Sequence, residues 1–323
     1  MIEPGGYILI TAFILDFFLG DPRQLPHLVV GMGKAIHFFE PRFRQMFKNP
    51  LTAGIFFTCF LVGTAYGMAW VLTGWAMRIH PLLGAGVQTL LLFYCFSIKG
   101  LKDAAMAVVA SLSIKDLKTA RKKLSLIVGR DTRTLDESGV TRAAVETVAE
   151  NFVDGFLAPL FWALVLGVPG AVAYKMINTL DSMVGYRNET YVLFGRASAR
   201  LDDAANFIPA RLSVFVIAVA AACLPNISGR RAWRTGWSEG RQHKSPNAGF
   251  PEAAFAGALK IRLGGPSIYH GTRVDKPYIG SVFNDPDISA VHTACRLMQT
   301  ASITGLVGAL VLIALNFTVF KGF

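Results

Sequence analysis

The sequence predicts an all-α, polytopic integral membrane protein with four to six transmembrane or re-entrant helices and large amphipathic cytoplasmic loops. Of its 323 residues, 53% are hydrophobic and only 16% are charged, whereas a soluble domain carries about 25% charged residues. Long uncharged stretches alternate with basic ones, and the net charge of +11 fits loops that follow the positive-inside rule. This composition excludes a disordered chain and a basic nucleic-acid arm, so we expect no nucleic-acid partner.

Three uncharged stretches reach the length of about 20 apolar residues that a spanning helix needs. Residues 51–77 and 79–98 meet at the sequence Arg78-Ile79-His80-Pro81, which predicts a transmembrane hairpin with a short turn. Residues 297–320 form the third stretch. These three are the spans that length and charge alone predict.

Three further stretches are weaker candidates. Residues 2–19 are just long enough to span but contain two carboxylates. Residues 152–174 contain Asp154 together with proline and glycine, which is typical of a broken or re-entrant helix. Residues 212–224 are too short to cross a membrane without borrowing from their flanks.

The Lys and Arg content of the loops predicts their side of the membrane. Basic residues concentrate in three loops at about 20–50, 99–150 and 227–296, which are therefore predicted to be cytoplasmic. The segment 173–211 lies outside if both flanking apolar stretches span and inside if neither does. We prefer the inside placement, because its polar motifs resemble those of the other loops. We expect the whole chain, 1–323, to form a single membrane-embedded domain.

Residues 100–128 have apolar residues at helical spacing and a basic polar face. This pattern predicts one long amphipathic helix. Such a helix could lie on an anionic membrane surface or pack against the rest of the protein, and the sequence leaves both open.

The first candidate site is a row of side chains that begins at Arg142. Glu146, Glu150 and Asp154 follow it at intervals of four residues, so that all four would share one face of a helix. The simplest interpretation is a solvated face with an Arg142–Glu146 ion pair. However, the row runs into an apolar segment, where an idle carboxylate is costly, and carboxylates one turn apart suit Mg²⁺.

A second candidate site follows, rich in Asn, Asp and Arg beside apolar segments. Arg196 and Arg200 lie one helical turn apart, with Asp203 three residues further on. This row could be a structural ion-pair ladder. Alternatively, arginine supplies a planar fork for phosphate or carboxylate, and aspartate can hold Mg²⁺ or an ammonium group.

The third candidate is the stretch that begins at His243 and includes Asn247. It predicts a turn followed by the start of a helix, with Pro251 and Glu252 in the first helical turn. A plain surface turn would have the same pattern.

Eight motifs, in this order, resemble those of the cobalamin-biosynthesis CobD/CbiB proteins, the adenosylcobinamide-phosphate synthases. The resemblance covers roughly residues 10–290. The motifs are Leu15-Asp-Phe-Phe-Leu-Gly-Asp-Pro22, Ser97-Ile-Lys-Gly-Leu101, Ile127-Val-Gly-Arg-Asp-Thr132, Val145-Glu-Thr-Val-Ala-Glu-Asn151, Tyr174-Lys-Met-Ile-Asn-Thr-Leu-Asp-Ser-Met-Val-Gly-Tyr186, Phe194-Gly-Arg196, Arg200-Leu-Asp-Asp203 and His243-Lys-Ser-Pro-Asn-Ala-Gly249.

The resemblance implies a multi-pass enzyme of the cell inner membrane that acts in the corrin pathway. Such an enzyme joins a propionate side chain of adenosylcobyric acid, a corrinoid, to aminopropanol or its O-phosphate through an amide bond. Mg²⁺ and ATP are expected from the reaction type, because a carboxylate must be activated before an amine can displace its oxygen. Membrane lipid and other corrin-pathway enzymes are further candidate partners.

The resemblance and the residue chemistry together suggest roles for the candidate residues. The catalytic candidates are Glu146, Asp181, Asp202, Asp203 and His243. The candidates for binding substrate or phosphate are Arg130, Arg187, Arg196, Arg200, Asn178 and Asn247, and those for binding metal are Glu146, Glu150 and Asp154. Histidine is included as a general base because its ordinary pKa lies near neutral pH.

Two other classes of function remain open on the sequence alone. Carboxylates inside apolar segments, together with a broken helix, are also found in ion-coupled membrane transporters. A membrane-anchored scaffold would need only the loops, as an interaction surface.

Overall fold

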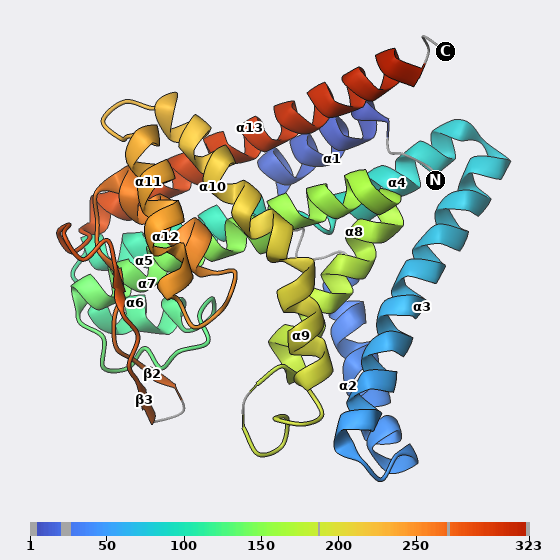
Figure 1. Cartoon of the computed structure of the whole chain (residues 1–323), viewed down its shortest axis with the longest axis horizontal. Helices are drawn as coiled ribbons and strands as arrows, with labels where there is room; N and C mark the ends of the chain where they lie inside the picture. Colours follow the sequence, from blue (N-terminus) through green and yellow to red (C-terminus); the bar gives the residue numbers. More distant parts are fainter. Residues whose placement is uncertain (1–4, 21–26, 187, 270–271, 321–323) are drawn as a thin grey trace. The chain divides into compact units, whose positions relative to one another are not determined.

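The computed structural model describes residues 5–20, 27–186, 188–269 and 272–320. This part of the chain is predominantly helical (Figure 1), which confirms the all-α class. Its strands form two small antiparallel ladders. One ladder pairs β1 (Leu263–Gly264) with β4 (Tyr278–Ile279), and the other pairs β2 (Ser267–Tyr269) with β3 (Thr272–Val274).

The chain divides into two compact units, each made of separate stretches of sequence. The first comprises Met1–Ser97, Asp154–Asn206 and Ala309–Phe323, and the second comprises Ile98–Val153 and Phe207–Gly308. The helices of the first unit are α1 (Gly6–Leu19), α2 (Leu28–Met46), α3 (Pro50–Ile79), α4 (Pro81–Phe93), α8 (Ala158–Val184) and α9 (Arg196–Ala205). Those of the second are α5 (Ile98–Ser113), α6 (Leu117–Leu124), α7 (Glu137–Phe152), α10 (Phe207–Ala222), α11 (Gly229–Glu239) and α12 (Gly249–Leu259), while α13 (Ile288–Phe320) belongs to both.

Five helical stretches of the described residues are long and apolar enough to cross a membrane, within the predicted range of four to six. They are Pro50–Ile79, Pro81–Ser113, Glu137–Val184, Arg196–Ala222 and Ile288–Leu315. The weak candidate at the N-terminus forms only the 14-residue helix α1, which is shorter than a span.

The predicted hairpin is present as α3 and α4, which meet at His80. Asn49 Oδ1 accepts the Leu51 N–H at 2.9 Å and Pro50 occupies the first turn, so α3 begins there. His80 ends α3, and its Nδ1 accepts the Leu82 N–H at 3.2 Å at the start of α4. One residue therefore closes one helix and caps the next, which makes the turn short.

The single amphipathic helix predicted over 100–128 is wrong, because the structure divides it into α5 and α6. Lys115 adopts a left-handed conformation with φ of 59°, and the Asp116 side chain accepts the Thr119 N–H at 2.9 Å. A residue in this conformation cannot continue a helix, and the Asp116 cap starts a new one. The apolar half, α5, belongs to a candidate membrane span, and the basic residues fall on α6.

The broken helix predicted near 152–174 is confirmed, with two separate interruptions. A π-helical turn occupies Val153–Leu157, directly after α7. Within α8, Gly167 has φ of 74°, and Pro169 follows two residues later. Left-handed backbone is accessible to glycine without a Cβ penalty, and proline cannot donate to the preceding turn, so this pair bends α8.

Gly54 allows α3 to approach the backbone of the segment before α9, within the first unit. A Cβ at position 54 would lie 1.9 Å from the carbonyl oxygen of Phe194, a buried residue. At Gly63, also on α3, no atom of a described residue lies within 4 Å of the position that a Cβ would take, apart from the adjoining residues and nearby backbone of the helix itself. The close packing of α3 therefore requires glycine at position 54 but not at position 63.

We expect Gly54→Ala to destabilise the protein by about 2 kcal/mol, because the added methyl group must displace main chain rather than a flexible side chain. Gly63→Ala is the matched control, and its effect should be neutral or slightly stabilising. Thermal unfolding of the full-length protein in detergent measures both changes. Equal melting temperatures for the two variants would contradict the close packing at Gly54.

Candidate functional site

The first unit brings together a polar network built around Asp154, which lies in the π-helical turn. Asp154 accepts hydrogen bonds from Tyr174 Oη at 3.2 Å and from Asn178 Nδ2 at 3.1 Å, both from α8. Tyr174 Oη also lies 2.9 Å from Oδ1 of Asn206, whose Nδ2 donates to Asp202 Oδ2 at 3.1 Å. The network therefore joins the π-helical turn, α8 and the end of α9.

Four aspartates surround this network, and we call them the carboxylate cluster: Asp154, Asp181, Asp202 and Asp203. All four are half-buried and within electrostatic range of one another, with Lys175 as a nearby cation of Asp154. Oδ1 of Asp202 is buried and accepts no hydrogen bond from a described residue. A buried acceptor without a donor is costly, so this oxygen is suited to receive a donor from a ligand.

Arg196 and Arg200 lie on the first turns of α9 and are exposed. Neither forms an ion pair with a described residue, so the described part of the chain contains no ion-pair ladder along α9. Their guanidinium groups are open to an anionic ligand instead. Arg187, which the sequence grouped with them, lies outside the described residues.

The second unit contains a different arrangement around Glu146 of α7. Glu146 is 2% exposed, and its Oε2 forms an ion pair with Arg130. Its Oε1 accepts the N–H of Gly264 at 2.6 Å. Both carboxylate oxygens are therefore engaged, which stabilises a charge that burial alone would disfavour.

The Arg142–Glu146 ion pair considered from the sequence is not formed. Arg142 instead pairs with Asp285, which also binds Arg262. Glu150 is exposed, and the α-helical spacing ends at Phe152, before Asp154 is reached. Glu146 and Glu150 belong to the second unit and Asp154 to the first. Their joint role in metal binding stays a prediction.

The half-buried His243 and the buried Glu252 form a pair in the second unit. His243 Nδ1 accepts the Ser245 N–H at 3.0 Å, and its Nε2 lies 4.0 Å from Glu252 Oε1. Burial, followed by the positive charge of Lys276, lowers the pKa of His243 to about 4. Burial, followed by the charges of Glu146 and Glu150, raises the pKa of Glu252 well above its ordinary value. Burial therefore favours the neutral form of each group, and His243 is a weak base.

Asn247 is buried and lies four residues after His243 in the sequence. It has a hydrogen-bond partner on α10. Its Oδ1 accepts a hydrogen bond from Arg211 Nη1 at 3.3 Å. This contact holds the turn after His243 against α10. A role for Asn247 in substrate binding stays a prediction.

A basic pocket of about 450 Å³ adjoins Arg130 in the second unit. The N–H of Asp131 donates to the carbonyl of Ile268 at 2.8 Å, which fixes the loop that carries Arg130 against β2. The carboxylate of Asp131 is paired with Arg133. The cationic side chains that line the pocket are Lys118, Arg121, Lys122, Arg130 and Arg133.

Comparison with known proteins identifies the family. The CobD/CbiB protein family model matches residues 9–298. Cobalamin biosynthesis protein CobD of Geobacter metallireducens is 48% identical over 93% of this chain and 94% of its own length. CobD of Klebsiella pneumoniae is 46% identical over 92% and 93%, and CbiB of Salmonella typhimurium is 44% identical over 91% and 93%. No solved structure matches this chain.

This chain belongs to the CobD/CbiB family. Membership supports a role in cobalamin biosynthesis. The structure of this CobD/CbiB protein therefore shows where a member of the family places its polar side chains.

Sequence reasoning assigns no role to three residues that form part of the sites in this CobD/CbiB protein: Tyr174, Asn206 and Gly264. Tyr174 and Asn206 are central to the first network, but the roles predicted from the sequence go to Asp154, Asn178, Asp181, Asp202 and Asp203 and not to these two. Spacing can identify both, because residues 174, 178 and 181 share one helical face, and residues 202 and 206 lie one turn apart. The Gly264 contact with Glu146 joins residues 118 positions apart, and no local pattern indicates it.

The pair of His243 and Glu252 predicts two opposing pH dependences of stability. The folded-state pKa of His243 is lowered, so its contribution is lost as pH falls from about 6.5 towards about 4. The folded-state pKa of Glu252 is raised, so its contribution is lost as pH rises from about 4.5. Above about pH 4.5 the two slopes oppose each other, which reduces the pH dependence of the wild-type stability.

We therefore expect Glu252→Gln to remove the glutamate contribution and leave that of His243. The free energy of unfolding should then rise with pH between about 4 and 6.5, by up to about 1.4 kcal/mol per pH unit. His243→Gln should expose the opposite slope. Melting temperatures of the full-length variants at several pH values provide the measurement. Parallel pH profiles for the two variants would contradict the assignment of both groups as neutral.

Proposed function

We propose that this CobD/CbiB protein forms an amide bond between a propionate carboxylate of adenosylcobyric acid and aminopropanol or its O-phosphate. The product is adenosylcobinamide or its phosphate. The protein acts in the cell inner membrane, with the loops that carry Arg130 and His243 in the cytoplasm. Family membership supports the pathway, and the carboxylate cluster supports the chemistry.

The observation that carries this proposal is the buried Asp202 oxygen that has no hydrogen-bond partner among the described residues. Oδ1 of Asp202 is buried among like charges and lacks a described donor. An ammonium group of the amine substrate would supply both the missing hydrogen bonds and a compensating charge. After the amine loses a proton to a carboxylate of the cluster, its lone pair becomes free to attack the activated carboxyl carbon.

Activation of the carboxylate is the second requirement, because oxide is a poor leaving group. ATP with Mg²⁺ supplies this activation when bound. Among the described residues, no three His, Cys, Asp or Glu side chains are arranged to hold a metal ion. One or two aspartates of the cluster still fit Mg²⁺, which commonly binds proteins through one or two carboxylates and completes its shell with water and phosphate.

The exposed arginines of α9 are assigned to the anionic groups of the substrates. Arg196 and Arg200 form no ion pair with a described residue and can each donate two parallel hydrogen bonds to a phosphate or carboxylate. Arg130 is assigned to phosphate as well, because it lines the basic pocket of the second unit. Asp154 of the carboxylate cluster is retained as a proposed Mg²⁺ ligand, whereas both oxygens of Glu146 are already engaged within the second unit.

An ion-coupled transporter is the alternative, favoured by the bent helix α8 and by Asp154 within a candidate span. One assay of the purified full-length protein separates the two. We expect ATP turnover only when adenosylcobyric acid and the amine are both present, with one amide formed per ATP consumed. ATP turnover or amide formation that does not depend on both substrates would overturn the proposed function.

We expect Asp202→Asn to lower the rate of amide formation about 100-fold, because the amide side chain cannot accept a proton or compensate an ammonium charge. The substitution is nearly isosteric, so the fold should be retained. Asp103→Asn, an exposed position on α5 that pairs with Lys99, is the matched control and should retain the wild-type rate. A wild-type rate for Asp202→Asn would remove Asp202 from the site.

We expect Arg196→Lys to lower the rate about tenfold or more, because an ammonium group cannot reproduce the two parallel hydrogen bonds of a guanidinium group. Arg234→Lys on α11 changes an equally exposed arginine outside the site and serves as the control. Rates and melting temperatures are measured together. If Arg196→Lys lowers stability and rate in the same proportion, its role is structural.

A further inference from the structure

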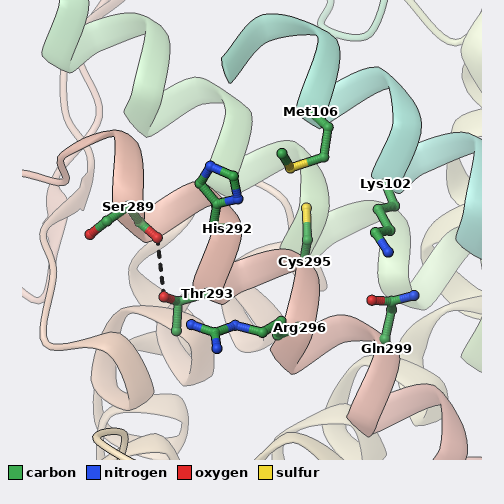
Figure 2. Close-up of a pocket in the computed structure, with 8 residues that line it drawn as sticks. All are labelled: Lys102, Met106, Ser289, His292, Thr293, Cys295, Arg296 and Gln299. Atoms are coloured by element: carbon green, nitrogen blue, oxygen red, sulfur yellow. Dashed lines mark hydrogen bonds between the residues drawn. The ribbon is translucent and has the colours of Figure 1, made fainter. Parts of the chain in front are cut away.

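A second pocket, of about 640 Å³, lies in the second unit between α5 and the first turns of α13. Figure 2 shows its lining, none of which takes part in the proposed reaction. Lys102 and Met106 come from α5. The other lining residues come from α13: Ser289, His292, Thr293, Cys295, Arg296 and Gln299.

The lining combines cations with neutral polar groups and contains no carboxylate among its described residues. Lys102 and Arg296 form no ion pair with a described residue, and His292 adds an imidazole. Figure 2 shows the sulfur atoms of Met106 and Cys295 between His292 and Lys102. The pocket thus combines positively charged side chains with apolar sulfur-containing ones. This arrangement is suited to an anion that has an apolar part.

Both cations lie at the ends of uncharged stretches of the sequence. Arg296 directly precedes the uncharged residues 297–320, and Lys102 lies four residues after the uncharged stretch 79–98. Both helices belong to candidate membrane spans. Basic residues at such positions lie at the level of the lipid headgroups, and basic pockets between membrane helices bind anionic headgroups.

The surface of α13 beyond the pocket is apolar and exposed. Ile303 is 46% exposed and Val307 is 53% exposed. They lie seven and eleven residues after Arg296, and therefore on the same helical face. A ligand with its anion at Arg296 could continue along this face with a hydrocarbon chain. A small soluble phosphate would use only the polar part.

We propose that this pocket binds the phosphate group of an anionic phospholipid. Arg296 and Lys102 contact the phosphate oxygens, Gln299 donates a further hydrogen bond, and the acyl chains follow Ile303 and Val307. The proposal does not rest on the amide-forming reaction, because no residue of that reaction lines the pocket.

The test is native mass spectrometry of the full-length protein in detergent with added phosphatidylglycerol or phosphatidylcholine. We expect the protein to bind phosphatidylglycerol more tightly. Arg296→Gln and Lys102→Gln should each weaken this binding about fivefold, since each basic residue near the surface contributes about that factor. Lys99→Gln, which removes one positive charge from the first turn of α5 at a position that does not line the pocket, is the matched control.

Three outcomes would overturn the proposal: equal binding of the two lipids, unchanged phosphatidylglycerol binding in both pocket variants, or an equal loss in Lys99→Gln. Inorganic phosphate is titrated into the same samples by calorimetry. Binding of free phosphate that depends on Arg296, without lipid selectivity, would assign the pocket to a soluble ligand and reject the phospholipid. Arg296→Lys keeps the charge and should restore most of the lipid binding, which guards against a variant that fails to fold.

Discussion

The cost of placing carboxylates beside apolar helices is the constraint on which both units depend. A buried charge is tolerated only when hydrogen bonds or an opposite charge replace the water that it loses. In the second unit Glu146 meets this requirement completely, through Arg130 and the Gly264 N–H. That contact also ties α7 to β1, so satisfying one charge fixes the position of distant segments.

The first unit meets the same constraint only in part. This difference distinguishes carboxylates with a structural role from those that can bind a ligand. Asp154 receives two hydrogen bonds, whereas Asp202 keeps one buried oxygen without a described donor. A group with all its partners inside the protein has little left to offer a ligand, while an incomplete group gains free energy when a ligand completes it. By this reasoning Glu146 is chiefly a structural residue and Asp202 is the better candidate for substrate contact.

The sequence predicts features that depend on local composition, and it misses those that depend on distant contacts. The length of the uncharged stretches predicts α3 and α13, and the proline and glycine near Asp154 predict a broken helix. The partner of Glu146 is not predictable from helical spacing, because Arg130 reaches it from a loop while the neighbour Arg142 turns to Asp285. The break at Lys115 is also hidden, since a left-handed lysine has no sequence signature comparable to glycine.

The π-helical turn explains how a polar site can be built inside an apolar helical stretch. Such a turn leaves a carbonyl free of its usual helical partner, and here Gly155 accepts the Ser97 N–H at 2.9 Å. A Cβ at position 155 would lie 2.3 Å from Ser97 Oγ, so glycine permits the contact. The same turn carries Asp154 towards Tyr174 and Asn178 of α8. A regular helix through this stretch would continue the α7 spacing, and Asp154 would then share the face of Glu146 and Glu150 instead of joining the carboxylate cluster.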